Sequence, residues 1–523
     1  MLALIVIPPV SKDKCNFPLL ARAISYVPLG LDALRVDVEV DVARGLPTLT
    51  IVGLPDQAVR EARDRVRAAI TNSQFRLPSQ RLTINLAPAD VKKEGGVFDL
   101  AIALGILAAS HQLPAERVAA CVALGELALD GTVRPVPGIL PIALSLARQV
   151  RRPLLVPQAA AAQAASIPGL EVIPVATLQQ AADYLRGTWE PAHSPRPRRS
   201  FAPPHHAVDF AELKGQAHAK RAVEIAVAGG HHLLLIGPPG AGKTMIARRM
   251  AGILPPLTLD EALEVTAVHS VAGLLSPGGG LVAARPFRAP HHTISTAALV
   301  GGGAQPRPGE VSLAHHGVLF LDEMPEFSRH VLEVLRQPLE EGRVAIARAA
   351  RAAVFPARFM LVGAMNPCLC GFLGDPMREC RCTPQQIDRY RGRLSGPLRD
   401  RLDLTVEVPA VALALFTTAA AGESSAAVRE RVMTGRDRQR TRYGGQGIRT
   451  NAELTPALMS RWCALDPKAM RLVETAVAKM SLSARGYDRV RKVARTIADL
   501  AGADAIRAEH VAEALQFRML EKG

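Results

Sequence analysis

Aromatic residues and long apolar runs are scarce in this sequence. Aromatic side chains make up 4% of the 523 residues, so we do not expect a nucleic-acid surface built on base stacking. A membrane-spanning helix needs about 18 or more consecutive apolar residues, and the sequence contains no such run. The apolar start, residues 1–10, is short and lacks the positive charge that opens a signal peptide. The sequence therefore predicts a cytoplasmic protein without membrane segments.

Cysteine is also infrequent and unevenly placed. Four of the seven cysteines lie in one short segment, which argues against a disulfide framework spread over the fold. They form two pairs, Cys368 with Cys370 and Cys380 with Cys382. Four thiolates in this pattern suit a tetrahedral zinc ion, although one residue separates each pair where about two to four are commoner. We predict structural zinc; a redox pair and unpaired thiols are the competing interpretations.

Acidic residues are too few to balance the basic ones. The sequence has 63 Lys and Arg against 48 Asp and Glu, which gives a net charge of +15. This excess favours a polyanionic partner, most simply DNA held through its phosphates. A generally basic, arginine-rich proteome with no specific ligand is the alternative.

A phosphate-binding loop is the strongest motif that the sequence contains. An apolar run, residues 233–236, precedes it, and a helix-forming run, residues 245–251, follows it. The motif G-x-x-x-x-G-K-[ST] comprises Gly237, Pro238, Pro239, Gly240, Ala241, Gly242, Lys243 and Thr244. We expect Lys243 to reach the β- and γ-phosphates and Thr244 to hold Mg²⁺. The order strand, glycine loop and helix predicts a nucleoside triphosphatase that binds ATP.

Two further segments supply the polar residues that hydrolysis needs. An apolar run ends in Asp322 and Glu323, which suit a carboxylate acting on Mg²⁺ and a carboxylate that polarises the attacking water. A buried strand that ends in a solvated acidic turn is the alternative. Asn366 follows the predicted strand 358–364, where its amide would orient the water or contact the γ-phosphate.

Arginines are so many that spacing alone does not select the catalytic ones. Arg401 lies in the segment 396–403, and its planar cation suits phosphate charge, supplied to a neighbouring subunit. Arg485 precedes a predicted helix and could contact the nucleotide of its own chain. A surface ion pair is the alternative for either residue.

Adjacent histidines occur at 291–292 and at 315–316. Neighbouring side chains in a strand point to opposite faces, so we do not expect such a pair to share a metal ion. The first pair lies in an arginine-containing loop, residues 285–293, which would face DNA, another subunit or only solvent.

The patterning predicts an α/β protein with a helical C-terminal part. We expect strands at 34–42, 48–52, 81–87, 118–129, 154–156 and 171–174, and helices at 57–72 and 99–110. Further helices are expected at 428–442, 456–463, 467–480, 487–501 and 508–518. The predicted parts are an extension (1–19), an α/β domain (20–187), a linker rich in proline and arginine (188–206), an ATPase core (207–415) and a helical lid (416–523).

Taken together, the motifs resemble those of magnesium-chelatase-like AAA+ ATPases, specifically the ComM (YifB) group. The resemblance rests on residues 51–56, 237–244, 285–295, 318–323, 365–371, 395–401 and 494–499. It implies a hexameric ring with ATP between subunits, in which Arg401 is the trans finger, Asn366 is sensor 1 and Arg485 is sensor 2. Residues 255–303 would form the helix-2 insert and 341–354 the hairpin that faces the pore. Arg399 replaces an apolar residue common in the family.

The same resemblance implies a function and a fold for the first domain. The group is known for helicases that drive branch migration of DNA during natural transformation, a process of homologous recombination. The first domain is similar to the Lon protease-like (ribosomal S5 domain 2-like) fold. Val97 or Phe98 stands where such a protease has its serine, and residues 138–141 where it has its lysine. Without nucleophile and base, peptide hydrolysis has no chemical route.

Two other functions remain open at this point. One is a motor subunit that drives Mg²⁺ insertion into a porphyrin, and the other is an ATPase that remodels proteins. Stimulation of ATP hydrolysis by porphyrin, by protein or by single-stranded or branched DNA would discriminate among them.

Overall fold

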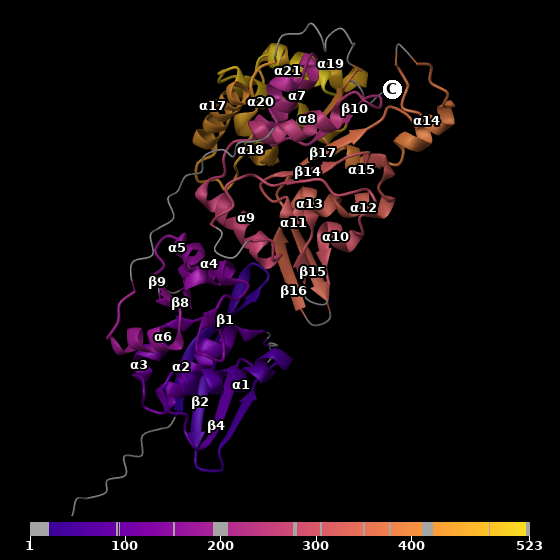
Figure 1. The fold of residues 1–523 in the computed structure, drawn as a ribbon. Coiled ribbons are helices and arrows are strands. Elements are labelled where there is room, and N and C mark those ends of the chain that lie inside the picture. The colour runs from indigo at the N-terminus through magenta and orange to yellow at the C-terminus, as the bar shows by residue number, and fades with distance from the viewer. Residues whose placement is uncertain are drawn as a thin grey trace, which may run out of the picture. The chain divides into compact units, whose positions relative to one another are not determined.

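The computed structural model divides into two compact units, Met1–Arg198 with Leu275–Gly280, and Arg199–Leu274 with Leu281–Gly523 (Figure 1). It describes residues 20–89, 93, 95–149, 152–191, 208–275, 280–303, 306–348, 351–375, 378–410, 422–480 and 482–518. The predicted extension 1–19 and most of the linker 188–206 lie outside these residues.

A seven-stranded mixed sheet organises the first unit, in the order β3-β4-β2-β1-β5-β8-β9. The strands are β1 (Leu20–Leu29), β2 (Asp32–Ala43), β3 (Thr48–Val52), β4 (Arg81–Ala87), β5 (Val122–Ala123), β8 (Leu154–Pro157) and β9 (Val172–Val175). In β2, Val36, Val38 and Val40 are buried while their neighbours are more exposed, as the alternation predicts. A short hairpin of β6 (Glu126–Leu127) and β7 (Val133–Arg134) lies outside the sheet.

The helices of the first unit are α1 (Gln57–Asn72), α2 (Asp99–Ala109), α3 (Ala115–Ala120), α4 (Ile139–Gln149), α5 (Ala161–Ala165) and α6 (Leu178–Arg186). Every residue of α2 is buried, and Asp99 at its start pairs with Arg65 of α1 at 2.8 Å. Val97 and Phe98 are buried apolar residues directly before α2.

The predicted strand 118–129 is wrong. Its first residues belong to helix α3, which begins after Pro114, and only β5 and β6 are extended. The segment is apolar and largely buried, so the spacing of its apolar residues does not distinguish a helix from a strand.

A five-stranded parallel sheet organises the second unit, in the order β11-β14-β17-β10-β18. The strands are β10 (Leu233–Ile236), β11 (Phe287–Arg288), β14 (Val318–Leu321), β17 (Met360–Met365) and β18 (Leu404–Glu407). All residues of β14 and β17 are buried, which explains why these strands are continuous apolar runs. Because the strands are parallel, the loops after β10, β14 and β17 leave the sheet at one edge.

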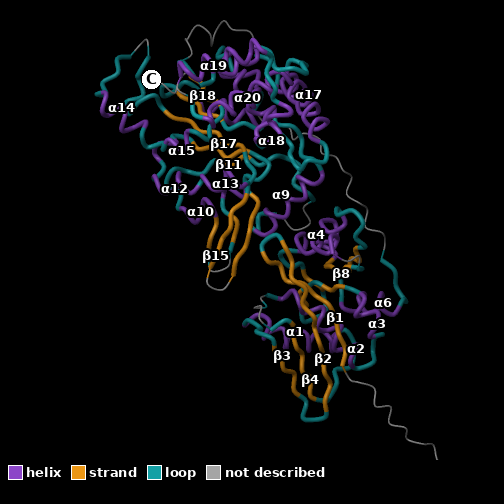
Figure 2. The backbone as a smooth tube through the Cα atoms, turned by 180° about the vertical axis from the view of Figure 1, so that it is seen from behind, coloured by secondary structure: helices purple, strands orange, loops and turns teal. Residues whose placement is uncertain are grey.

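The other elements of the core are mostly short. Its helices are α7 (Ala217–Gly229), α8 (Lys243–Arg249), α9 (Leu259–Val271), α10 (Thr296–Val300), α11 (Glu310–Leu313), α12 (Arg329–Val334), α13 (Arg336–Glu341), α14 (Pro384–Arg391) and α15 (Gly396–Arg399). Two antiparallel pairs complete it, β12 (Gly301–Gly302) with β13 (Arg307–Pro308) and β15 (Arg343–Arg348) with β16 (Arg351–Pro356). The second pair is the predicted hairpin, and it projects from the core in Figure 2.

The C-terminal helices share one hydrophobic core with the parallel sheet. They are α17 (Ser425–Tyr443), α18 (Pro456–Trp462), α19 (Pro467–Met480), α20 (Ala484–Leu500) and α21 (Ala508–Gln516), close to the predicted bounds. Val432, Val490 and Val493 pack in the same cluster as Leu233 and Val362 of the sheet. Among the described residues, none of the helices combines the length and apolarity needed to cross a membrane.

Candidate functional site

The predicted nucleotide residues meet at the carboxyl edge of the parallel sheet. The phosphate loop, residues 237–244, follows β10, which lies between β17 and β18. Asp322 and Glu323 follow β14, and Asn366 follows β17, which pairs directly with β10. Sequence spacing and sheet order thus bring three separate motifs to one place.

Lys243 and Asn366 are in direct contact. Lys243 Nζ donates hydrogen bonds to the carbonyl oxygens of Gly237 at 2.7 Å and Pro238 at 2.9 Å, and to Asn366 Oδ1 at 3.0 Å. Burial lowers the pKa of Lys243, and the carboxylates of Asp322 and Glu323 partly offset this effect because they raise the pKa. The ammonium is therefore only partly compensated by protein charge, which suits a group that binds phosphate.

Thr244 and Asp322 form the second contact of the site. The Thr244 hydroxyl donates to Asp322 Oδ2 at 2.6 Å, and the Glu323 N–H donates to Asp322 Oδ1 at 3.0 Å. A hydroxyl and a carboxylate oxygen are ligands that suit Mg²⁺, so these residues fit a magnesium ion. Glu323 itself is exposed and has a left-handed backbone, φ 49°, and its carboxylate lies 4.0 Å from His292 Nδ1.

Backbone conformation requires glycine at some positions of the loop, and close packing requires it at another. Gly240 and Gly242 adopt left-handed conformations, φ 79° and 87°, that side chains disfavour. Gly237 lies against the next strand, where a Cβ would come within 2.1 Å of the Val408 carbonyl oxygen. Gln216 Nε2 donates to the Ala241 carbonyl at 2.8 Å and holds the loop from outside.

Arg401 and Arg485 lie in a different cavity, which we call the arginine pocket. It has a volume of about 520 Å³, and none of residues 237–244 lines it. Arg401 is buried and pairs with Glu340, and Arg485 Nη2 lies 4.0 Å from the same carboxylate oxygen. Arg401 Nε has no hydrogen-bond partner among the described residues. A contact between Arg485 and the nucleotide of its own chain stays a prediction.

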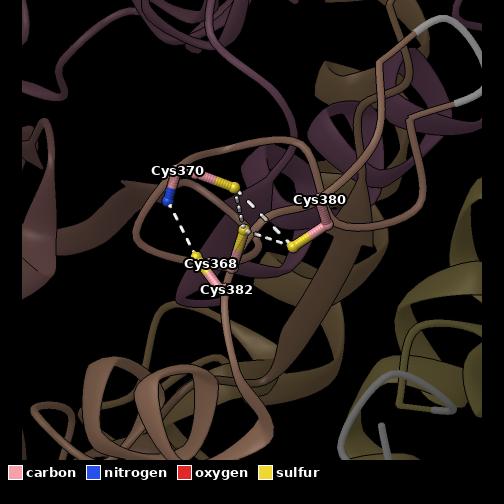
Figure 3. Close-up of side chains that lie close together, drawn as sticks. All are labelled: Cys368, Cys370, Cys380 and Cys382. Atoms are coloured by element: carbon pink, nitrogen blue, oxygen red, sulfur yellow. Dashed lines mark hydrogen bonds between the residues drawn. The ribbon is translucent and has the colours of Figure 1, made fainter.

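The four clustered cysteines converge, as Figure 3 shows. The Sγ atoms of Cys368, Cys370 and Cys380 lie 3.4 to 3.7 Å apart, and Cys382 Sγ accepts the Cys370 N–H at 3.3 Å. Tetrahedral zinc at about 2.3 Å from each sulfur would need sulfurs about 3.8 Å apart, so the residues fit this ion. The observed distances far exceed a disulfide bond of about 2.05 Å, so these cysteines are in the thiol state, and a reversible redox pair stays open beside zinc.

The expectation that adjacent histidines diverge is wrong for His315 and His316. His316 has a left-handed backbone, φ 56°, and both rings face the Glu264 carboxylate, at 3.0 and 2.6 Å. His315 Nδ1 accepts the Arg358 N–H at 3.1 Å, so its proton is on Nε2 and points at Glu264. A protonated Nε2 is no metal ligand, and the three residues form a hydrogen-bonded cluster instead.

Several residues of the site escaped the sequence analysis. Glu340 and Tyr390 carry no motif of their own, and the motif that ends in Gly371 gave no sign of its contact with Pro239, so only the tertiary fold brings these residues to their partners. Tyr390 is buried beside the backbone of Asn366, with which its hydroxyl forms a hydrogen bond. His292, in the arginine-containing loop, has its Nδ1 4.0 Å from Glu323 Oε2, so this loop borders the nucleotide site.

Three family models match the chain. The model described as magnesium chelatase, subunit ChlI, matches residues 209–415, and its C-terminal counterpart matches 422–518. A third, described as subunit ChlI of Mg-chelatase, matches residues 38–160. The first two matches lie in the second unit and the third lies in the first unit.

The chain is similar over nearly its whole length to several curated proteins. It is 46% identical to competence protein ComM of Haemophilus influenzae, covering 96% of this chain and 98% of that protein. It is 44% identical to uncharacterized protein YifB of Escherichia coli, covering 94% and 96%. The magnesium-chelatase 38 kDa subunit of Cereibacter sphaeroides is 25% identical over 39% of this chain and 62% of its own length.

Proposed function

Because the chain belongs to the ComM (YifB) family of magnesium-chelatase-like proteins, an AAA+ ATPase-like family, we propose that it is an ATP-driven hexameric DNA motor. Its substrate would be single-stranded or branched DNA, and its task branch migration in natural transformation or homologous recombination. The observation that carries the ATPase assignment is the pair of contacts Lys243–Asn366 and Thr244–Asp322.

Each residue at the sheet edge has a role in hydrolysis. Lys243 binds the β- and γ-phosphates in place of its present carbonyl partners, and Asn366 orients the γ-phosphate beside it. Thr244 and Asp322 hold Mg²⁺, which supplies charge neutralisation on the phosphates. Glu323 accepts a proton from the attacking water.

The second half of the reaction site comes from a neighbouring subunit. Arg401 lines a cavity that the phosphate loop does not line, which supports a contact with the nucleotide of another chain, whereas Arg485 in the same cavity is proposed to contact the nucleotide of its own chain. A ring with ATP at each junction satisfies this requirement, and a trans-acting arginine compensates the charge of the transition state.

Charge and relatives support DNA as the partner. The net charge of +15 suits a polyanion. The β15–β16 hairpin carries the exposed Arg343 at its base, which would offer a cation to a DNA strand in the ring pore. One relative is named a competence protein, which suits a role in DNA uptake. A cytoplasmic location and a structural zinc ion on Cys368, Cys370, Cys380 and Cys382 complete the proposal.

A chelatase motor is the second candidate, since the family models carry that name. The chelatase subunit matches a much smaller part of this chain than ComM does, which favours the DNA motor.

The deciding experiment measures ATP hydrolysis and junction movement together. We expect single-stranded and forked DNA to stimulate wild-type turnover, a branched junction to migrate, and Lys243→Ala to abolish both, because the phosphates lose their cationic partner. An ATPase that ignores DNA and moves no junction would reject the motor. Stimulation by porphyrin would then indicate the chelatase, and stimulation by protein a remodelling ATPase.

A further inference from the structure

The cysteine cluster touches the nucleotide site at Gly371. This residue follows Cys370, donates its N–H to the Cys368 carbonyl at 3.1 Å and has a left-handed backbone, φ 85°. A Cβ on Gly371 would lie 2.6 Å from Pro239 Cδ and 2.8 Å from Pro239 Cγ. The backbone of the cysteine turn therefore packs directly on the phosphate loop, with no space for a side chain between them.

The same cluster adjoins Asn366. Cys368 is completely buried two residues after Asn366, so it fixes the chain as it leaves β17. Helix α14 begins two residues after Cys382 and returns to this point. Its Tyr390 hydrogen-bonds the backbone of Asn366, and Arg391 Nε donates to the Pro367 carbonyl at 3.3 Å.

A metal ion would tie these two contacts together. The first cysteine pair adjoins Gly371, which packs on Pro239, and the second pair directly precedes α14. The Sγ atoms of all four cysteines lie within 4.8 Å of one another. Four sulfurs at this spacing suit a single tetrahedral ion between them.

Building on the proposed function, we propose that the metal-bound cysteine cluster positions the nucleotide site. The ion joins residues 368–370 to residues 380–382, and this closed segment holds Pro239 on one side and Asn366 on the other. Lys243 contacts the Asn366 side chain directly and, on the other side, the carbonyl of Pro238, the residue before Pro239. Gly371 is a positioning residue, and loss of the ion loosens the phosphate loop and lowers ATP affinity.

Two glycines of the cysteine segment provide a matched test. Gly371 and Gly374 both have left-handed backbones, φ 85° and 78°, so alanine costs similar backbone strain at either position. A Cβ at Gly374 meets nothing within 4 Å, whereas one at Gly371 meets Pro239. We expect Gly371→Ala to raise the Kd for a fluorescent ATP analogue about tenfold, because Pro239 must move, and to keep its zinc. Gly374→Ala should keep wild-type affinity.

Removal of the metal tests whether the ion itself is needed for ATP affinity. Cys380→Ser should lower zinc content, measured by elemental analysis, and raise the Kd for the ATP analogue; Cys121→Ser, in the other unit, should change neither. Thermal unfolding of each variant shows whether it is folded. Wild-type ATP affinity in both Gly371→Ala and zinc-free Cys380→Ser overturns the inference while leaving the ATPase intact. Wild-type protein without zinc overturns the metal assignment, and wild-type protein that binds no ATP overturns the proposed function itself.

Discussion

The phosphate site and the arginine pocket lie in one unit, but their cationic side chains have different partners. Lys243 is held by three neutral oxygens from its own loop and the adjoining strand, at 2.7 to 3.0 Å. Arg401 and Arg485 compete for one carboxylate, and Arg401 Nε has no partner among the described residues. Eight Lys and Arg side chains line the arginine pocket, against five carboxylates. The cation of the phosphate site has its hydrogen-bond partners within the chain. The arginine pocket, by contrast, is lined by more positive than negative side chains.

This difference indicates how each region would meet the phosphate of a nucleotide. A half-buried cation that is satisfied by neutral groups is ready to exchange them for phosphate with little rearrangement. Arg401 is buried, and a buried cation is costly unless an anion compensates it. Under the proposed function, the two regions are complementary halves of one reaction site that two neighbouring subunits complete.

The largest expected effect comes from separating the two halves on different subunits. Arg401→Ala should lower turnover about 10³-fold, because the transition state loses a cation. Lys243→Ala subunits still offer Arg401, and Arg401→Ala subunits still offer a phosphate loop. In randomly mixed rings, about a quarter of the junctions combine one intact loop with one intact arginine, so mixing two inactive proteins should restore measurable ATPase activity.

Arg399→Ala is the matched control for this experiment. Arg399 lies two residues before Arg401 but is exposed and does not line the arginine pocket. We expect it to keep nearly normal turnover. Failure of the mixed rings to recover, with assembly confirmed by sedimentation, would assign both halves to a single chain and break the comparison.

A smaller effect is expected at Glu340, which holds the two arginines in the isolated chain. Glu340 is about half exposed, so its pairing with Arg401 contributes about 0.5–1 kcal/mol, equivalent to about a two- to fivefold effect. Glu340→Gln should release Arg401 for the neighbouring phosphate and raise turnover by about that factor. Glu341→Gln changes the adjacent carboxylate, which pairs with Arg343 instead, and should leave turnover unchanged. Reduced turnover in Glu340→Gln would mean that the pair positions Arg401 rather than restrains it.

The sequence singled out the residues that the structure brings together at the end of the parallel sheet, because local chemistry marks each of their motifs. Glycines in a loop between a strand and a helix, and acidic residues after a buried strand, are recognisable without tertiary information. Parallel pairing of β10 with β17 then brings Asn366 to Lys243. The long amphipathic elements, such as α1 and β2, could also be predicted, because their apolar residues recur at the spacing of a helix or a strand.

The arginine pocket and the cysteine contact were not predictable in the same way. Among many arginines, Arg401 and Arg485 differ only by the cavity that they line. Gly371 is one glycine of 41, and its closeness to Pro239 depends on how two loops leave neighbouring strands. For His315 and His316, the argument from strand geometry failed because a left-handed turn replaced the strand.

The two regions should also differ in their response to acid. His315, behind the arginine pocket, is buried beside Glu264, His316 and Arg449, and burial lowers its pKa from 6.5 to about 4 despite the hydrogen bond to Glu264. Between these values the unfolded chain binds a proton that the folded chain does not, so stability falls as the pH drops from 6.5 to 4. At pH 5 this costs about 2 kcal/mol. Thermal unfolding at pH 7.5 and pH 5 should show a smaller loss for His315→Gln than for wild type, and the wild-type loss for His291→Gln, which changes an exposed histidine beside the phosphate site. An equal loss in His315→Gln would place the acid-sensitive group elsewhere.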